Sequence, residues 1–259
     1  MKQLRRMLTA SEDYFSPFPI GAEPPNVLMS GEELQSAQDN DASFQASYSE
    51  LEAKRREESE KLKETLYITV ARHTVSTELL RLYEDEQVMS KKLVPTFEED
   101  SSGDGVLQVL YTLFWDDFIC ENCKGSSQFA LKLLPQMSDK YETVGRIITH
   151  QFIQCASFPV QLASASVQHV LFGTVEEDCL LNSFLHLLPP RQKEVFAGAL
   201  QGKQPFPQDT IIDVLDDYNT QKMPSPQNLR EIVLKISTME FIDKPFLPLL
   251  QIRKGMGPF

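Results

Sequence analysis

The sequence lacks the features that mark membrane and secreted proteins. None of its apolar runs reaches the roughly 18 residues that a membrane-spanning helix needs. The basic start MKQLRRMLTASEDYF has no apolar segment behind it, which a secretory signal requires. Only four cysteines occur, they are scattered, and no Asn-x-Ser/Thr glycosylation site is present. We therefore expect no membrane partner and a reducing compartment, the cytoplasm, with the nucleus as an alternative.

Positive charge is scarce as well. The 259 residues include 37 acidic and 25 basic side chains, which gives a net charge of −12. Phosphate contacts dominate nucleic-acid affinity, and an acidic surface repels phosphate unless basic residues gather on one face. Basic clusters such as Arg5-Arg6, Lys54-Arg55-Arg56 and Lys91-Lys92 are short. We therefore expect no nucleic-acid partner.

Composition divides the chain into four segments and predicts a mainly α fold with a few short β-strands (α+β). Residues 1–48 offer little apolar surface to offset the entropy of ordering and are predicted to be a disordered tail. Residues 49–64 are nearly all charged helix formers, which predicts a solvent-exposed helix. The main domain spans residues 65–188, and residues 189–259 are a C-terminal helical segment that we expect to pack on it.

Alternating and helical spacings predict the elements of the first part of the main domain. Residues 66–71 alternate in polarity and predict a strand, followed by a helix over about 76–84. Residues 93–97 predict a second strand, which Pro95 confines to a sheet edge or a bulge. Residues 106–119 predict a long core helix.

The middle of the chain predicts three helices joined by a proline turn and a glycine. A helix carrying Val144 and Ile148 ends at Phe158-Pro159, since the residue before a proline avoids the helical region. A second, short helix ends at Gly173 as a left-handed C-cap. The predicted N-terminal caps are Ser138 for the first helix and a capping box of Thr174 and Glu177 for the third.

Three amphipathic helices are expected after residue 188. Asp209 is the predicted N-cap of the second, and Ser225 with Pro226 begins the third. The final stretch FLPLLQIRKGMGPF is apolar without an element to close it, which is typical of a cut end.

Cys120 and Cys123 form the most tempting chemical motif, Cys-x-x-Cys. A redox pair of this type lies at a helix N-terminus, where the helix dipole lowers the pKa of the thiol. Here the pair falls at the predicted C-terminal end of a helix, where the dipole opposes thiolate formation. A zinc site needs a second pair, and Cys155 and Cys179 stand apart. We interpret all four as ordinary thiols and leave open a role for Cys120 and Cys123.

The other chemical motifs are incomplete. The histidines lack HExxH or HxH spacing, and no GxSxG nucleophile elbow occurs. The stretch GALQGK at 198–203 is one residue short of a phosphate-binding loop and predicts a helix C-cap. His150, one residue off the apolar stripe, is interpreted as a hydrogen-bonded histidine at the edge of the core. The sequence therefore assigns no catalytic, cofactor-binding or metal-binding residue.

One stretch reads VGRIITHQFIQCASFPVQL and leads to a short helix ending in LFG; it resembles the middle of the large lobe of HECT-type ubiquitin ligases. The stretch from Tyr67 to Phe118 resembles the start of the same lobe, with a strand, a helix, a second strand containing Phe-Glu, a turn and a long helix. The resemblance covers residues 65–188. It implies a HECT large-lobe-like helical domain, ubiquitin-protein transfer as the family activity, and a ubiquitin-conjugating enzyme and protein substrates as partners.

The chain departs from the family pattern where the family's chemistry is carried out. Transfer requires a cysteine in a small C-terminal lobe, in a His-Thr-Cys setting, and no cysteine here follows His-Thr. Gln108 and Val109 stand where the family usually has Arg-Glu. Our first hypothesis is thus a fragment or pseudo-ligase that is inactive alone. The alternatives are a non-enzymatic helical adaptor, and a regulatory bundle over residues 189–259 that contacts a conjugating enzyme.

Overall fold

The computed structural model describes residues 52–98, 105–132, 134, 137–159, 161–220 and 222–257. It separates the chain into a unit that ends at Lys61 and a larger unit that begins at Leu62. In the first unit, residues 52–60 are helical, so the charged helix predicted over 49–64 ends earlier than expected. The disordered tail predicted for residues 1–48 lies outside the described residues.

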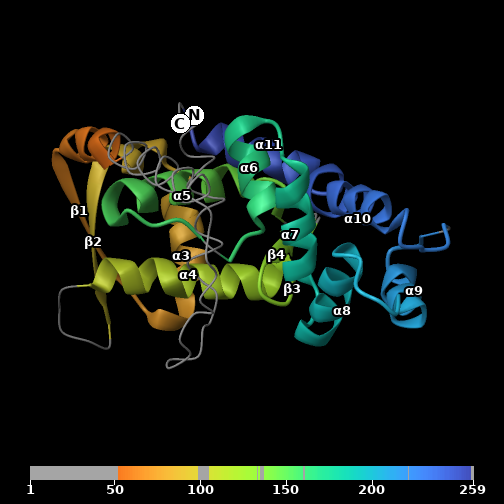
Figure 1. Ribbon diagram of the computed structural model, residues 1–259. Helices are drawn as coiled ribbons and strands as arrows, with labels where there is room; N and C mark the ends of the chain where they lie inside the picture. The colour runs from red at the N-terminus through yellow and green to blue at the C-terminus, as the bar shows by residue number, and fades with distance from the viewer. Residues whose placement is uncertain are drawn as a thin grey trace, which may run out of the picture. The chain divides into compact units, whose positions relative to one another are not determined.

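The larger unit is mainly helical with two small two-stranded sheets, which confirms the predicted fold class (Figure 1). It begins with β1 (Glu64–Val70) and β2 (Lys91–Phe97), which pair in parallel. The 3-10 helix η1 (Arg72–Thr74), helix α3 (Val75–Leu82) and the 3-10 helix η2 (Glu86–Ser90) connect them. Such a crossover is needed because a tight turn joins only antiparallel strands.

The long helix α4 (Val106–Asn122) lies beside this strand–helix–strand unit and contacts both α3 and β2. It leads into a hairpin of β3 (Cys123–Gly125) and β4 (Phe129–Leu131). The predicted core helix is confirmed: its buried face includes Leu110, Tyr111, Phe114, Trp115 and Phe118.

Three helices follow as predicted: α5 (Tyr141–Cys155), α6 (Ser164–Phe172) and α7 (Glu177–Leu187). Gly173 ends α6 in the left-handed conformation with φ of 73°, which confirms that C-cap. The proline is not what ends α5, because Ala156 already adopts a left-handed φ of 53°.

Both predicted caps in this region are wrong. The residue that precedes α5 is Lys140, and Ser138 instead donates a hydrogen bond to Asp139 over 3.3 Å. Glu176 precedes α7, so Thr174 is two residues outside the helix and makes no capping bond. An N-cap hydroxyl acts only from the residue that directly precedes the first turn.

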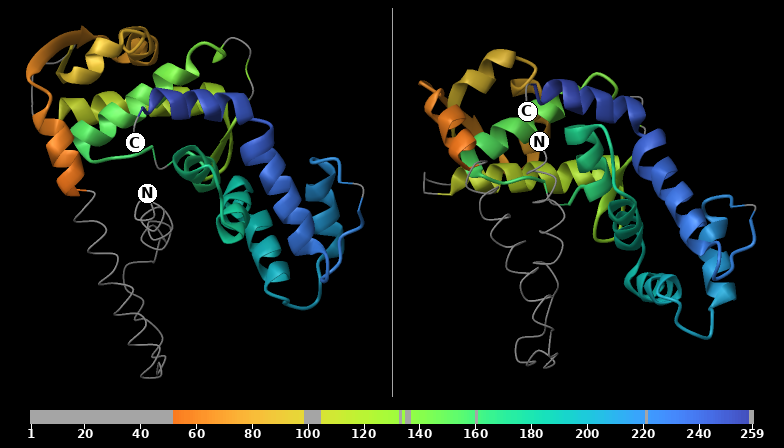
Figure 2. Two further views of the ribbon diagram at one scale, coloured as in Figure 1. Left: turned by 90° about the horizontal axis from the view of Figure 1, so that it is seen from above. Right: turned by 45° about the horizontal axis from the view of Figure 1, so that its top comes forward.

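The C-terminal segment contains α8 (Pro190–Leu200), α9 (Gln208–Asp216), α10 (Leu229–Thr238), a π-helical turn η4 (Met239–Asp243) and α11 (Phe246–Gly255). Helices α8, α9 and α10 extend from α7 as a second layer (Figure 2). They share with α7 one apolar core around Phe184 and Phe196, whose rings lie 5.5 Å apart.

Three expectations for this segment need correction. Asp209 lies within the first turn of α9, after the capping position at Pro207. Asn228 precedes α10, and Pro226 belongs to the turn before it. The final apolar stretch does have an element that covers it: it forms α11, which packs along α5.

The contact between α5 and α11 depends on two glycines. A Cβ atom placed on Gly145 would lie 2.1 Å from the carbonyl oxygen of Ile252, and one on Gly255 would lie 1.8 Å from that of Glu142. The two backbones therefore touch directly. Thr149 adds a hydrogen bond of 3.2 Å to the carbonyl of Met256.

We predict that Gly145→Ala and Gly255→Ala each lower the free energy of unfolding by about 1–3 kcal/mol, because the new methyl group forces the helices apart. Gly198→Ala in α8 is the matched control. Its Cβ would come no closer than 3.5 Å to Lys203, so it should raise stability by about 0.5–1 kcal/mol through helix propensity. Urea unfolding measures all three, and similar effects at the three positions would contradict the close contact.

Candidate functional site

The described part of the chain contains a buried polar network that joins four elements. The Tyr83 hydroxyl lies 2.8 Å from the Tyr111 hydroxyl and 2.7 Å from His150 Nδ1. Gln154 Nε2 lies 2.7 Å from the other ring nitrogen of His150, and Gln154 Oε1 accepts the Leu93 amide over 2.9 Å. The network thus connects α4, the end of α3, α5 and β2.

The hydrogen-bond directions in this network follow from its two ends. Since Gln154 Oε1 accepts from Leu93, its amide nitrogen faces His150 and can only donate. His150 Nε2 then accepts, Nδ1 donates to Tyr83, and Tyr83 donates to Tyr111. Each of these contacts then pairs one donor with one acceptor. A buried polar network stabilises the fold when its members are paired in this way.

Burial keeps these groups neutral. It lowers the pKa of His150 to about 4, although the Lys91 carbonyl acts in the opposite direction. Burial also raises the pKa of Tyr83 and of Tyr111 well above the ordinary tyrosine value. The expected hydrogen-bonded role of His150 is confirmed, but the ring is fully buried and does not lie at the edge of the core. We interpret the network as structural, since neither cavity described below is lined by these residues.

Trp115 has a packing role on α4. Its indole nitrogen donates to Gln151 Oε1 over 2.6 Å, and its ring packs edge-on against Phe114 and Phe118.

The four cysteines are not brought together. Cys120 is exposed in the last turn of α4, which confirms its predicted place at a helix C-terminus. Cys123 begins β3, where burial raises the pKa of its thiol to about 12. Cys155 is half-buried and Cys179 is buried in the core of the second layer. Among the described residues, no three His, Cys, Asp or Glu side chains converge as metal ligands would.

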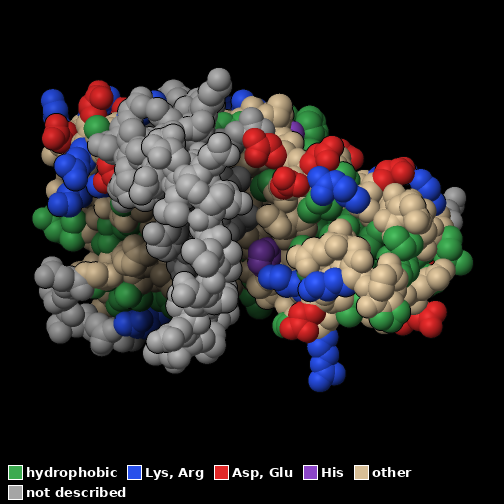
Figure 3. All heavy atoms as spheres, viewed as in Figure 1, with side chains coloured by type: hydrophobic (Ala, Val, Ile, Leu, Met, Phe, Trp, Pro, Cys, Tyr) green, Lys and Arg blue, Asp and Glu red, His purple; other side chains and the backbone are tan. Residues whose placement is uncertain are grey.

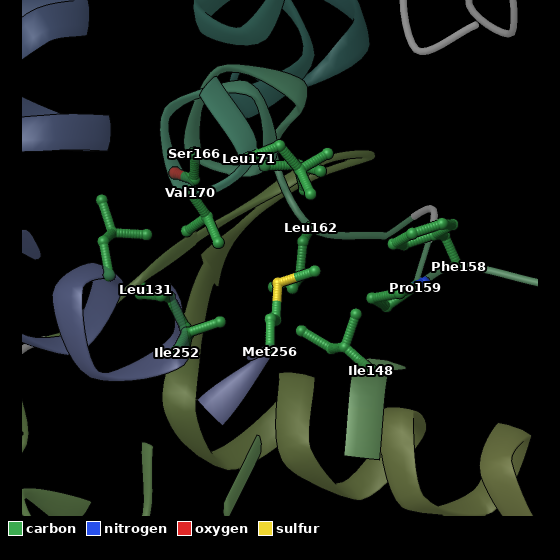
Figure 4. Close-up of a pocket in the computed structure, with 12 residues that line it drawn as sticks. Leu131, Ile148, Phe158, Pro159, Leu162, Ser166, Val170, Leu171, Ile252 and Met256 are labelled. Carbon is green, nitrogen blue, oxygen red and sulfur yellow. The ribbon is translucent and has the colours of Figure 1, made fainter. Parts of the chain in front are cut away.

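A small apolar cavity lies between α5, α6 and α11 (Figure 4). Its walls include Ile148, Leu162, Val170 and Met256, which come from separate elements and point toward one another in Figure 4. The volume of the cavity is about 20 Å³. A single water molecule needs roughly 10–15 Å³. The space is too small for a cofactor and is best described as a packing gap under α11.

A larger groove lies where the end of α9 meets α10. Its volume is about 250 Å³, and its walls mix apolar and polar side chains: Tyr218, Asn219, Thr220, Lys222, Glu231, Ile232, Lys235, Ile236 and Met239. Lys222 and Glu231 form an ion pair of 3.0 Å at the rim. Asn219 has a left-handed φ of 53°, which turns the chain toward α10.

The base of this groove is held by contacts to the second core. The Tyr218 ring packs against Phe184 at 5.7 Å, and burial raises the pKa of its hydroxyl to about 12. Met223, just beyond the groove wall, is 65% exposed and its carbonyl accepts a bond from Asn228. An exposed thioether beside a polar groove suits the binding of a polypeptide, because methionine adapts its shape to a partner.

Glu240 is the most deeply buried carboxylate described. It lies in η4 and accepts hydrogen bonds from Lys124 of β3, at 2.5 Å, and from Lys244. Burial alone would raise its pKa, but the two lysines outweigh this and lower it. The π-turn thereby ties α10 and α11 to the hairpin.

The sequence did not predict the groove, and it assigned no residue of it a role. The predicted C-cap at 198–203 is confirmed, since Gly202 has φ of 75° and the Lys203 amide bonds the Gly198 carbonyl. On the face shown in Figure 3, acidic and basic side chains are interspersed over the described atoms, as on an ordinary solvated surface. In the described ranges, no helix combines the length and the apolar character needed to cross a membrane.

No protein-family model and no curated protein matches this sequence. The functional conclusion therefore depends on the geometry and on the residues themselves.

We predict that His150 makes stability depend on pH. The unfolded chain takes up a proton near the ordinary value of 6.5, whereas the folded chain does so only near 4, so protons favour unfolding between these values. From pH 7 to pH 5 the free energy of unfolding should fall by about 2 kcal/mol from this residue alone. Comparing urea unfolding of the natural chain and of His150→Gln isolates the effect, and identical pH profiles would contradict it.

Proposed function

We propose that this chain is a HECT-like large-lobe scaffold that acts in protein ubiquitination by binding a ubiquitin-conjugating enzyme, without accepting ubiquitin itself. The family part of the proposal rests on the resemblance over residues 65–188. The binding part rests on the groove between α9 and α10.

The observation that carries the proposal is the packing of the strand–helix–strand unit on the helical body. The HECT resemblance predicts two strands near residues 66–71 and 93–97 that lie against the helices of 141–173. In the structure β2 is bonded to α5 through the Leu93 amide and Gln154, and α3 contacts α5 as well. A plain helical adaptor gives no reason for this arrangement, so it supports the HECT-like hypothesis over its rival.

The cysteines support the second half of the proposal. An acyl-accepting thiol must be accessible and readily deprotonated. Cys123 and Cys179 are buried, and Cys155 is half-buried at the end of α5. Cys120 is exposed in the last turn of α4, but it does not follow His-Thr as the acyl-accepting cysteine of the family does. At the start of α4, where the family usually has Arg-Glu, Gln108 and Val109 are both exposed.

The groove is our candidate for the conjugating enzyme. It lies in the 189–259 helices, which occupy the place in the chain order where the family's docking subdomain stands. It offers polar side chains for hydrogen bonds and an apolar neighbour, Met223, for an anchor contact. This site needs no catalytic residue of its own.

We predict that the chain forms no ubiquitin thioester. The purified protein is incubated with activating enzyme, conjugating enzyme, ubiquitin and ATP, and the products are separated with and without a reducing agent. Reducible adducts should appear on the activating and conjugating enzymes but not on this chain. A reducible ubiquitin adduct on this chain, lost in Cys120→Ala, would refute the scaffold role and indicate a transferase.

We further predict that Met223→Asp weakens binding of a conjugating enzyme about tenfold or more, because a charge replaces the apolar anchor contact beside the groove. Met223 is 65% exposed, so the fold should be unaffected. Leu250→Asp on α11, where the side chain is 53% exposed, is the matched control and should leave affinity unchanged. Binding is measured by interferometry across a panel of conjugating enzymes. Failure of the whole panel to bind would favour the adaptor hypothesis.

A further inference from the structure

The two strands of the first sheet differ in how their outer edges are protected. Beyond β2, the Leu93 amide is already bonded to Gln154, and the strand carries Pro95 and two lysines. These features are the usual protection of an edge against pairing with another chain. From Thr65 to Val70, β1 has no charge, no proline and no glycine.

The backbone groups of β1 that face outward can be identified from its pairing. The Val70 carbonyl accepts the Glu98 amide over 3.1 Å, so Val70 faces β2. In a parallel pair the residues alternate between the two sides, which turns the amides and carbonyls of Thr65, Tyr67 and Thr69 away from β2. Among the described residues, none bonds these three on their outer side. Figures 1 and 2 both show β1 at the rim of the larger unit.

The side chains of β1 are also incompletely covered. Tyr67 is 76% exposed, the highest value among the large hydrophobic side chains described. On the opposite face Leu66 and Ile68 remain half-buried, although their β2 partners Leu93 and Pro95 are both buried. A strand added beside β1 would cover both faces.

We propose that two copies of this chain associate through β1, with the two strands antiparallel about a two-fold axis at Tyr67. Tyr67 then lies opposite its own copy, and Thr65 lies opposite Thr69 of the second copy. In each of these pairs, the main-chain groups of both residues point toward the other copy. Each pair therefore exchanges two main-chain hydrogen bonds. Between these pairs, Leu66 meets Ile68 on the core face. The result is a continuous four-stranded sheet, β2–β1 followed by β1–β2 of the second copy.

The sequence of β1 permits this register and disfavours the registers centred on other outward-facing residues. Centring the axis on Thr65 would pair the strand with the turn at 61–63, and centring it on Thr69 would run it into η1. With the axis at Tyr67, Glu64 lies opposite Val70, and no like charges face each other along the strand. Cross-strand aromatic and β-branched pairs of this kind stabilise a sheet.

The proposed interface is small. A stable protein–protein interface buries roughly 1,200–2,000 Å² of surface. Edge pairing of a seven-residue strand buries less than this. We therefore expect a reversible dimer whose population rises with protein concentration. The inference is independent of the proposed function, because the groove and β1 lie on different elements.

A charge swap at Tyr67 tests the proposal. Sedimentation velocity of the full chain over a concentration series should show reversible dimers. Tyr67→Lys and Tyr67→Glu should each raise the dissociation constant about tenfold or more, since like charges then face each other at the axis. Mixing the two variants should restore dimers, which a simple loss of structure cannot do. Leu250→Lys, at an apolar position on α11 that is 53% exposed, is the control and should dimerise normally.

Hydrogen exchange locates the contact. Protection of the amides of Thr65, Tyr67 and Thr69 should increase with concentration, while those of Leu66, Ile68 and Val70, already bonded to β2, should stay protected throughout. The proposal is overturned if the chain remains monomeric at all concentrations. Dimers that are insensitive to both Tyr67 variants, or a mixture that stays monomeric, overturn it equally.

Discussion

The direct backbone contact between α5 and α11 is the constraint on which the rest of the structure depends. Gly145 and Gly255 have no side chains, so the last described helix lies against the central one at the shortest separation possible. The opposite side of α5 is bonded to the strand unit through His150 and Gln154. Because α5 is buried over most of its length, any change in its position is transmitted to both layers.

Patterns within a few residues of each other were sufficient to predict most of the fold. The alternation of Leu66, Ile68 and Val70 and the apolar stripe of α4 are local consequences of strand and helix geometry, and the structure confirms both. The predicted caps at Ser138 and Thr174 are wrong because a cap depends on the residue at which a helix starts, and both helices start two positions later than predicted.

Features that depend on distant residues could not be predicted in this way. The stretch FLPLLQIRKG lacks partners in its own neighbourhood, and its apolar face is satisfied by α5, about a hundred positions earlier. The network from Tyr83 to His150 joins residues 67 apart, so His150 alone gave only a general expectation of hydrogen bonding. The groove was not predicted because its walls are ordinary side chains from two helices and the turn between them, which come together only in the folded chain.

Several of the groups that burial perturbs are paired with a structural partner. His150 and its two tyrosines are neutral members of one network, and Glu240 is held by two lysines that bridge a hairpin and a π-turn. In an active site, perturbed groups face a cavity where a reacting atom can enter. His150, Tyr83, Tyr111 and Glu240 line neither described cavity, and only Tyr218 among the perturbed groups named above faces the groove. This distribution agrees with the binding role that we propose, in which the buried groups fix the shape of the surfaces that meet a partner.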